Sequence, residues 1–195
     1  MAESLHLPEP GAPPPTTPRL LWRWIVTQWR RAFRVNTSRL DEFLFVGGEF
    51  PCAQWPAVHA LGVRAVLSLQ GEREDEFCEP LPVRALRLEV EDFHPPSLDQ
   101  LEAAVAFLRQ ARADGLPTLI HCHAGVGRAP LTTAAYLMAE GMSQQEAIAR
   151  IYAARPIIRL NRRQQARLAE WAQQLRLPRQ TPSQAADQPD PAQAG

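Results

Sequence analysis

The feature that most constrains the fold of this chain is a short apolar strand that runs into a turn with two glycines and then into a helix. The strand is predicted over residues 119–121, Gly125 and Gly127 lie in the turn, and the helix is predicted to begin near Arg128. Glycines let successive backbone N–H groups turn toward one point, because they carry no Cβ that would clash. Such an array at the N-terminus of a helix binds a tetrahedral oxyanion. The sequence therefore predicts an anion-binding loop between a strand and a helix.

Two reactive side chains stand at the ends of this loop. Cys122 follows the strand directly, and Arg128 stands six residues later. The N–H groups and the helix dipole favour the thiolate of Cys122, which is its nucleophilic form. The planar guanidinium of Arg128 can donate to two oxygens of one phosphate. We predict that Cys122 and Arg128 are catalytic and that the phosphate is held by His123, Ala124, Gly125, Val126, Gly127 and Arg128. A small buried structural cysteine is the alternative reading of Cys122.

Strand and helix patterns alternate along most of the remaining chain. Strands are predicted at 43–46, 63–69 and 83–88, and helices at 55–61, 98–115, 128–140, 144–154 and 162–175. This alternation predicts an α/β fold with a short, mostly parallel sheet flanked by helices. Residues 36–177 are expected to form this domain. Residues 1–18 and 178–195 are rich in proline and small residues, and both tails are predicted to be disordered.

The segment HCHAGVGRAP, residues 121–130, resembles the signature loop of the protein tyrosine and dual-specificity phosphatase superfamily. Its AGxGRAP part is similar to the phosphatase-of-regenerating-liver group, and the resemblance covers about residues 36–175 in element order. It implies a cysteine-phosphatase fold of the dual-specificity type and a phosphocysteine intermediate on Cys122. It also implies that His121 supports the nucleophile and that no cofactor is needed. The sequence shows no metal-ligand spacing.

The resemblance further implies a general acid on a loop upstream of the signature loop. Asp92 stands thirty residues before Cys122, and Pro95 and Pro96 follow it closely. We assign the acid to Asp92, while the adjacent Glu91 stays open as an alternative. Glu89 belongs to the end of the preceding strand. These carboxylates would also suit a plain solvated loop.

One position departs from the family pattern. Most members carry Ser or Thr directly after the arginine, where the hydroxyl assists cleavage of the phosphoenzyme, but this chain has Ala129. The departure implies fast formation and slow hydrolysis of phosphocysteine, since Thr132 and Thr133 are expected to face elsewhere.

Downstream, the segment at residues 154–168 resembles the one that packs behind the signature loop. Asn161 is expected either to brace that loop or to cap the last helix. Gln164 and Gln165 are expected on the helix surface rather than beside the catalytic water.

The substrate class stays open from the sequence alone. Within the loop only His123 could meet an additional phosphate, which favours a phosphoprotein substrate. The alternatives are a lipid or phosphoinositide phosphatase at a membrane surface, and a phosphate-binding module with slow turnover. A formal net charge of zero gives no sign of a nucleic-acid partner, and we expect a monomer.

Residues 19–35 form a predicted helix that is both basic and aromatic. Leu21, Ile25, Trp29 and Phe33 recur at helical spacing, and the intervening arginines are Arg23, Arg30, Arg31 and Arg34. The aromatic stripe either docks on the domain or lies in a membrane interface.

Cys52 and Cys78 match no disulfide framework and are expected to be unpaired structural residues, which favours a reducing, cytoplasmic location. If the predicted helix at residues 19–35 binds lipid, the protein would also be associated with a membrane.

Overall fold

The computed structural model describes residues 15, 17–33 and 35–176, and for residues 30–33 it describes the backbone alone. The two tails predicted to be disordered fall almost wholly outside these residues. In chain order the elements are α1 (Pro18–Phe33), β1 (Thr37–Arg39), β2 (Leu44–Gly47), the 3₁₀ turn η1 (Cys52–Gln54), α2 (Trp55–Ala60), β3 (Ala65–Gln70), β4 (Arg84–Val90), α3 (Leu98–Ala113), β5 (Thr118–His121), α4 (Arg128–Ala139), α5 (Gln144–Ala154) and α6 (Arg162–Arg176).

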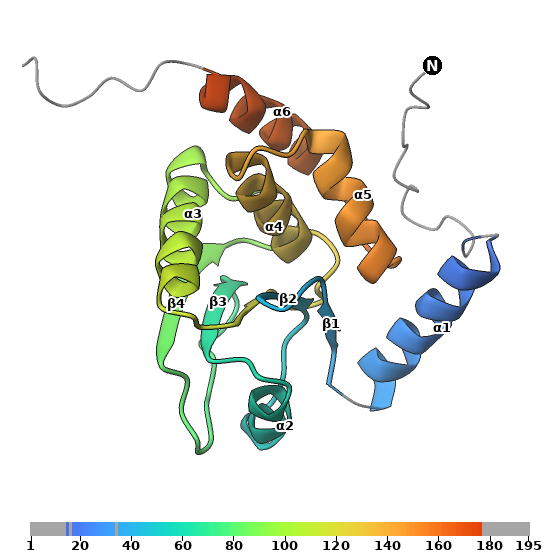
Figure 1. The fold of residues 1–195 in the computed structure, drawn as a ribbon, viewed down its shortest axis with the longest axis vertical. Helices are drawn as coiled ribbons and strands as arrows, with labels where there is room; N and C mark the ends of the chain where they lie inside the picture. Colours follow the sequence, from blue (N-terminus) through green and yellow to red (C-terminus); the bar gives the residue numbers. More distant parts are fainter. Residues whose placement is uncertain (1–14, 16, 34, 177–195) are drawn as a thin grey trace, which may run out of the picture.

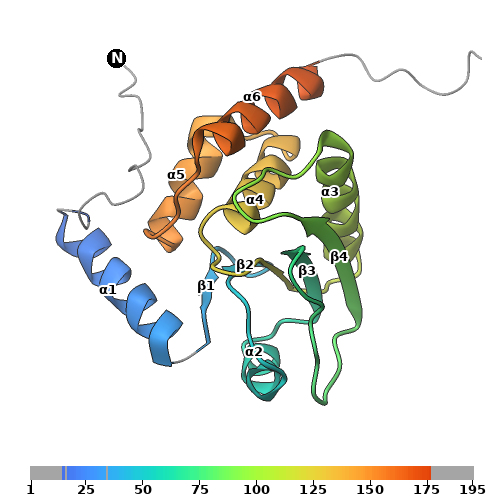
Figure 2. The ribbon, with the colours of Figure 1, turned by 180° about the vertical axis from the view of Figure 1, so that it is seen from behind.

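The five strands form one sheet in the order β1-β2-β5-β3-β4. The pairs β2–β5, β5–β3 and β3–β4 are parallel, whereas β1 pairs with β2 in the antiparallel direction. Helices α3 to α6 cover one face of the sheet, and α2 lies against the other (Figures 1 and 2). The prediction of an α/β fold with a short, mostly parallel sheet is confirmed.

The central strands carry the core of both layers because their side chains alternate between the two faces. Leu67 of β3 and Ile120 of β5 pack under helices α3 to α6. Val66 and Leu119, their neighbours in sequence, pack against Trp55 of α2 on the opposite face. Every residue of β3 and β5 is buried, as expected for strands that are covered on both sides.

Local sequence signals set the ends of the helices. Ser97 and Ser143 are the N-caps of α3 and α5, and each takes part in a complete capping box. Gly141 follows α4 with φ +100°, a backbone conformation that residues other than glycine rarely adopt. Strand β1 was not predicted, since its three residues, TSR, have no apolar alternation. The strand depends on its pairing with β2.

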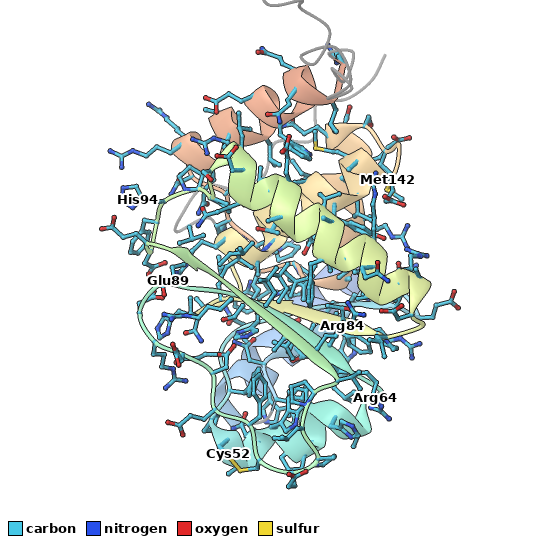
Figure 3. The ribbon with its side chains drawn as sticks, turned by 90° about the vertical axis from the view of Figure 1, so that its left-hand side faces the viewer. Cys52, Arg64, Arg84, Glu89, His94 and Met142 are labelled. Atoms are coloured by element: carbon cyan, nitrogen blue, oxygen red, sulfur yellow. A yellow bond between two sulfur atoms is a disulfide. The ribbon has the colours of Figure 1, made fainter. Side chains whose placement is uncertain are left out.

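The prediction that Cys52 and Cys78 are unpaired was wrong. They form a disulfide, drawn in Figure 3 beside the label of Cys52, with their Cα atoms 5.2 Å apart. The fold brings η1 against the loop between β3 and β4, a proximity that a separation of 26 residues does not reveal. The expectation of a reducing compartment loses the support of unpaired cysteines. Trp55 also donates its Nε1–H to the carbonyl of Pro80, so this loop is fastened at two points.

Helix α1 lies beside β1 and α5 (Figure 1). Thr27 is buried, and Arg23 donates to the carbonyl of Ala153 at the end of α5. No helix of the described ranges is long and apolar enough to cross a bilayer.

Candidate active site

Strand β5 delivers Cys122 to the C-terminal edge of the sheet, and the loop after it leads to the first residue of α4, Arg128. Cys122 is 2% exposed and lies in a cavity of about 280 Å³. The residues that line this cavity are Asp92, Phe93, Cys122, Ala124, Val126, Gly127, Arg128, Arg159, Asn161 and Gln164. The structure therefore brings the predicted nucleophile, arginine and acid together in one cavity.

The tight turn of the loop depends on Gly125. Its φ is +67°, and a Cβ built there would lie 2.4 Å from the carbonyl carbon of Gly47 and 2.5 Å from Nη2 of Arg155. No other residue fits without moving the backbone of β2. The curl of the loop thus follows from a glycine that both its conformation and its neighbours require.

A fully buried arginine, missed from the sequence, holds the loop from behind. Arg155 donates from Nε to the carbonyl of Gly125 at 2.7 Å and from Nη2 to that of Ala124 at 3.3 Å. Nη2 also donates to Oδ1 of Asn36 at 2.7 Å. The backbone N–H of Arg159 donates to Val126, so the segment after α5 packs behind the signature loop as its resemblance implied. The only sequence signal for Arg155 was its place at the start of that segment.

Arg128 is 2% exposed and is held by two carboxylates. Glu72 accepts from Nη1 at 2.9 Å and from Nη2 at 2.7 Å, and Asp92 lies 2.9 Å from Nη2. The hydrogen bond from Arg128 is the main reason why the pKa of Glu72 is lowered, although burial acts in the opposite direction. Glu72 was not predicted, because its position in the loop after β3 gave no sign that it reaches Arg128.

The carboxylates near the proposed acid differ clearly in position. Asp92 lines the cavity and contacts Arg128. The side chain of Glu91 is 83% exposed and lies 3.6 Å from His94, and that of Glu89 pairs with Arg87 at 2.8 Å. Of the three candidates, only Asp92 is among the residues that line the cavity.

His121 has a carboxylate partner that the sequence did not indicate. Its Nε2 lies 2.8 Å from Oδ2 of Asp75, and the two side chains are 0% and 8% exposed. An ionised carboxylate only accepts hydrogen bonds, so Nε2 carries a proton. Burial acts to raise the pKa of Asp75, but the hydrogen bond and charge of His121 lower it below the ordinary value of 3.8. Asp75 thereby fixes the ring of the residue directly before the nucleophile.

The side chain of His123 does not line the cavity. It is 54% exposed, and its Nδ1 lies 3.0 Å from the carboxylate of Glu49. The carbonyl of His123 accepts from the backbone N–H of Glu49 at 2.9 Å. The ionisable side chain within the loop thus pairs with Glu49, and a role of His123 in holding the phosphate would fall to its backbone.

Asn161 serves the last helix and the acid loop. Its Oδ1 accepts from the N–H of Gln164 as an N-cap, and its Nδ2 donates to the carbonyl of Phe93 at 2.7 Å. It therefore braces the loop of Asp92 and not the signature loop. Thr132 and Thr133 bond carbonyls within α4, as expected.

The surface position predicted for Gln164 was wrong. Its side chain is buried and lines the cavity, and a Cβ at Gly127 would lie 2.8 Å from its Nε2. Gln165 is exposed, as predicted.

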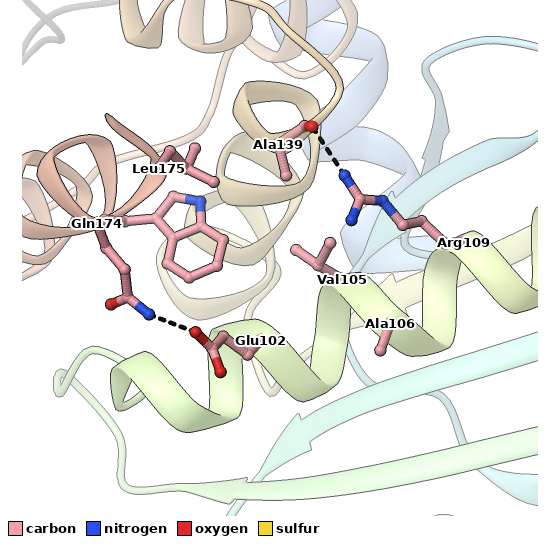
Figure 4. A pocket seen from close by; sticks show the side chains of 8 residues that line it. Glu102, Val105, Ala106, Arg109, Ala139, Gln174 and Leu175 are labelled. Atoms are coloured by element: carbon pink, nitrogen blue, oxygen red, sulfur yellow. Dashed lines mark hydrogen bonds between the residues drawn. The ribbon is translucent and has the colours of Figure 1, made fainter. Parts of the chain in front are cut away.

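A second hollow lies between α3, α4 and α6 (Figure 4). Glu102, Arg109 and Gln174 line it together with apolar side chains, and Arg109 donates there to the carbonyl of Ala139. Its lining contains no cysteine, serine or histidine. The cavity of Cys122, which is lined by a nucleophile and an arginine, is therefore the candidate active site.

Comparison with known proteins agrees with this geometry. The family model described as "Dual specificity phosphatase, catalytic domain" matches residues 44–174. Human dual specificity protein phosphatase 12 is 36% identical over 98 residues, which are 49% of this chain and 29% of that protein. Dual specificity protein phosphatase Mpk3 of Drosophila melanogaster is 28% identical over 136 residues, 69% of this chain and 33% of that protein. The matches thus span about a third of the length of these relatives.

Solved structures show the same likeness over most of their length. PTPMT1 in complex with PI(5)P has a TM-score of 0.64 at 27% identity, covering 71% of this chain and 96% of that chain. Tk-PTP in its active form has a TM-score of 0.63 at 25% identity, covering 70% and 96%. The match of the family model over most of the chain, together with the nucleophile, arginine and carboxylate in one cavity, shows that this chain belongs to the dual-specificity phosphatase family of cysteine-based phosphatases.

Proposed function

We propose that this chain hydrolyses phosphate monoesters on proteins through a phosphocysteine intermediate. The observation that carries the proposal is the cavity that places Asp92 and Arg128 beside Cys122. The N-terminus of α4 and the loop N–H groups bind the phosphate oxygens. Phosphotyrosine is the first expected substrate, and phosphoserine and phosphothreonine follow.

In the first step the Cys122 thiolate attacks phosphorus. The S–P bond forms, the P–O bond to the leaving group breaks, and Asp92 donates its proton to the leaving oxygen. The incoming phosphate replaces Asp92 at Nη2 of Arg128, while Glu72 keeps its two hydrogen bonds to the guanidinium.

In the second step water attacks phosphorus, the S–P bond breaks, and Asp92 accepts the proton of the water. Ala129 offers no hydroxyl to the departing thiolate. The Thr132 and Thr133 hydroxyls donate to the carbonyls of Arg128 and Ala129. We therefore propose that hydrolysis of the phosphoenzyme limits turnover.

A second candidate function is the hydrolysis of a phosphoinositide. Arg159 lines the cavity as a second cationic side chain, which suits a substrate with a further anionic group. The structure of PTPMT1 with PI(5)P is a neighbour of this fold, and this supports the same candidate. The uncharged interior of the loop and the outward position of His123 favour the phosphoprotein.

A panel of substrates separates these candidates. Wild-type protein is assayed on phosphotyrosyl, phosphoseryl and phosphothreonyl peptides and on phosphoinositides, with Cys122→Ser as the inactive control. We expect phosphotyrosyl peptides to be turned over fastest. Higher kcat/KM on a phosphoinositide would favour the second candidate, and activity equal to that of Cys122→Ser on every substrate would leave a phosphate-binding module.

The acid is tested within the same panel by two matched variants of one loop. Asp92→Asn should lower kcat by about 10²–10⁴-fold on substrates with poor leaving groups. Glu91→Gln should leave kcat unchanged, because that side chain is 83% exposed and does not line the cavity. A larger effect of Glu91→Gln would move the acid to Glu91.

A further inference from the structure

Helix α1 presents large apolar side chains to solvent. Trp22 is 67% exposed, Ile25 46% and Trp29 49%. These residues are three and four positions apart, so they lie on one face of the helix. The opposite side, with the buried Thr27, faces the domain. Of the two readings that the sequence left open, the one in which the aromatic stripe docks on the domain does not fit these exposed side chains.

The segment around α1 also concentrates positive charge. Six arginines lie between Pro10 and Leu40, and that stretch contains no Asp or Glu. Because the net charge of the whole chain is zero, the remaining residues carry an equal excess of carboxylates. The exposed apolar face therefore lies on a strongly cationic segment, while the rest of the chain has a net negative charge.

We propose that α1 binds an anionic lipid surface, with Trp22, Ile25 and Trp29 inserted at the level of the headgroups. Tryptophan favours this interface, and a cationic helix gains further from anionic lipid. With 16 residues, α1 is roughly 24 Å long and can lie flat along the surface. The proposal is independent of the substrate and of the proposed function.

A second copy of this chain fits the same face less well. In a symmetric dimer through α1 the same patch would meet itself, so two copies of a segment with six arginines and no Asp or Glu would lie side by side. An anionic membrane offers the complementary charge without that repulsion. The lipid surface is therefore the occupant that the charge distribution favours.

Binding of the full chain to vesicles tests this inference. The chain is mixed with phosphatidylcholine vesicles and with vesicles that also contain phosphatidylserine, at low and at high salt. We expect co-sedimentation with the anionic vesicles that weakens as salt rises. The double variant Trp22→Ala/Trp29→Ala should bind at least about tenfold more weakly, because two inserted side chains are lost. Leu81→Ala is the matched control, since Leu81 is 56% exposed but lies on the loop between β3 and β4.

Two further measurements keep the result unambiguous. Circular dichroism and activity on a soluble substrate should be unchanged in the double variant, because neither Trp22 nor Trp29 lines the cavity. Absence of binding to anionic vesicles at low salt, or equal binding by the double variant, would overturn the proposal. A dimer in solution that the double variant abolishes would instead assign the face to a second copy.

Discussion

Replacing Asp75 by Asn tests whether the buried pair with His121 stabilises the fold as a charged interaction. Asn has almost the same shape as Asp, and its Oδ1 can still accept from Nε2 of His121. What changes is the negative charge of a side chain that is 8% exposed and 2.8 Å from a fully buried ring. The substitution therefore isolates the charge and leaves the packing of the loop in place.

The size of the effect follows from the two kinds of hydrogen bond. A hydrogen bond to a charged group contributes about 1.5–3 kcal/mol and a neutral one about 0.5–1.5 kcal/mol, so Asp75→Asn should lower the free energy of unfolding by about 1–2 kcal/mol. Solvent screening does not reduce this value much, because neither side chain is substantially exposed. Asp75→Ala, which leaves a buried N–H without its partner, should cost about 1–3 kcal/mol.

The pH dependence gives the decisive control. The folded-state pKa of Asp75 lies below the ordinary value of 3.8, so its carboxylate adds stability above that value and loses it as pH falls through the lower folded pKa. Urea unfolding of wild type and Asp75→Asn at several pH values should show a gap at neutral pH that closes in acid. A gap that is absent at neutral pH, or that stays constant down to pH of about 3, would refute the charged interaction.

Three other substitutions test separate parts of the site. Ala129→Ser should raise steady-state turnover, because the added hydroxyl assists the departing thiolate. Rapid-quench measurement should show that less phosphoenzyme accumulates. Unchanged turnover would exclude the missing hydroxyl as the cause of slow hydrolysis. Asn161→Ala should lower the free energy of unfolding by about 1 kcal/mol, because the helix cap is lost. It should also lower kcat on substrates with poor leaving groups, since the loop of Asp92 loses its hydrogen bond at Phe93. A kcat equal to that of wild type would show that this hydrogen bond is dispensable. Gly125→Ala should abolish activity and lower the melting temperature markedly, because its Cβ would meet the backbone of β2; a stable, active variant would show that the loop has room there.

The sequence was informative wherever a residue acts through its own chemistry or through its neighbours along the chain. The signature loop is such a case, because Cys122, the glycines and Arg128 are contiguous and their spacing carries the chemistry. The helix ends are another, since Ser97 and Ser143 bond N–H groups only three residues ahead. Asp92 was predicted from the family resemblance, which implies an acid on a loop before the signature loop, and it lines the same cavity as Cys122.

The residues that were missed act across the fold. Glu72 lies 56 residues from Arg128, Asp75 lies 46 from His121, and Arg155 lies 30 from Gly125. Each pair meets only after the parallel strands have brought separate loops to one edge of the sheet. The disulfide of Cys52 and Cys78 has the same origin. Whether Gln164 is buried or exposed likewise depends on how α6 packs against the signature loop. The sequence pattern around Gln164 does not specify this packing.

We propose that Cys122 carries the phosphoryl group during turnover. The most direct test is to mix the full chain with a phosphotyrosyl peptide, quench in acid within the first turnovers, and map the modified peptide by mass spectrometry. We expect one added phosphoryl group on the peptide that contains Cys122, and more of it in wild type than in Ala129→Ser. Turnover that proceeds with no phosphoryl group on that peptide, or that persists in Cys122→Ser, would contradict it.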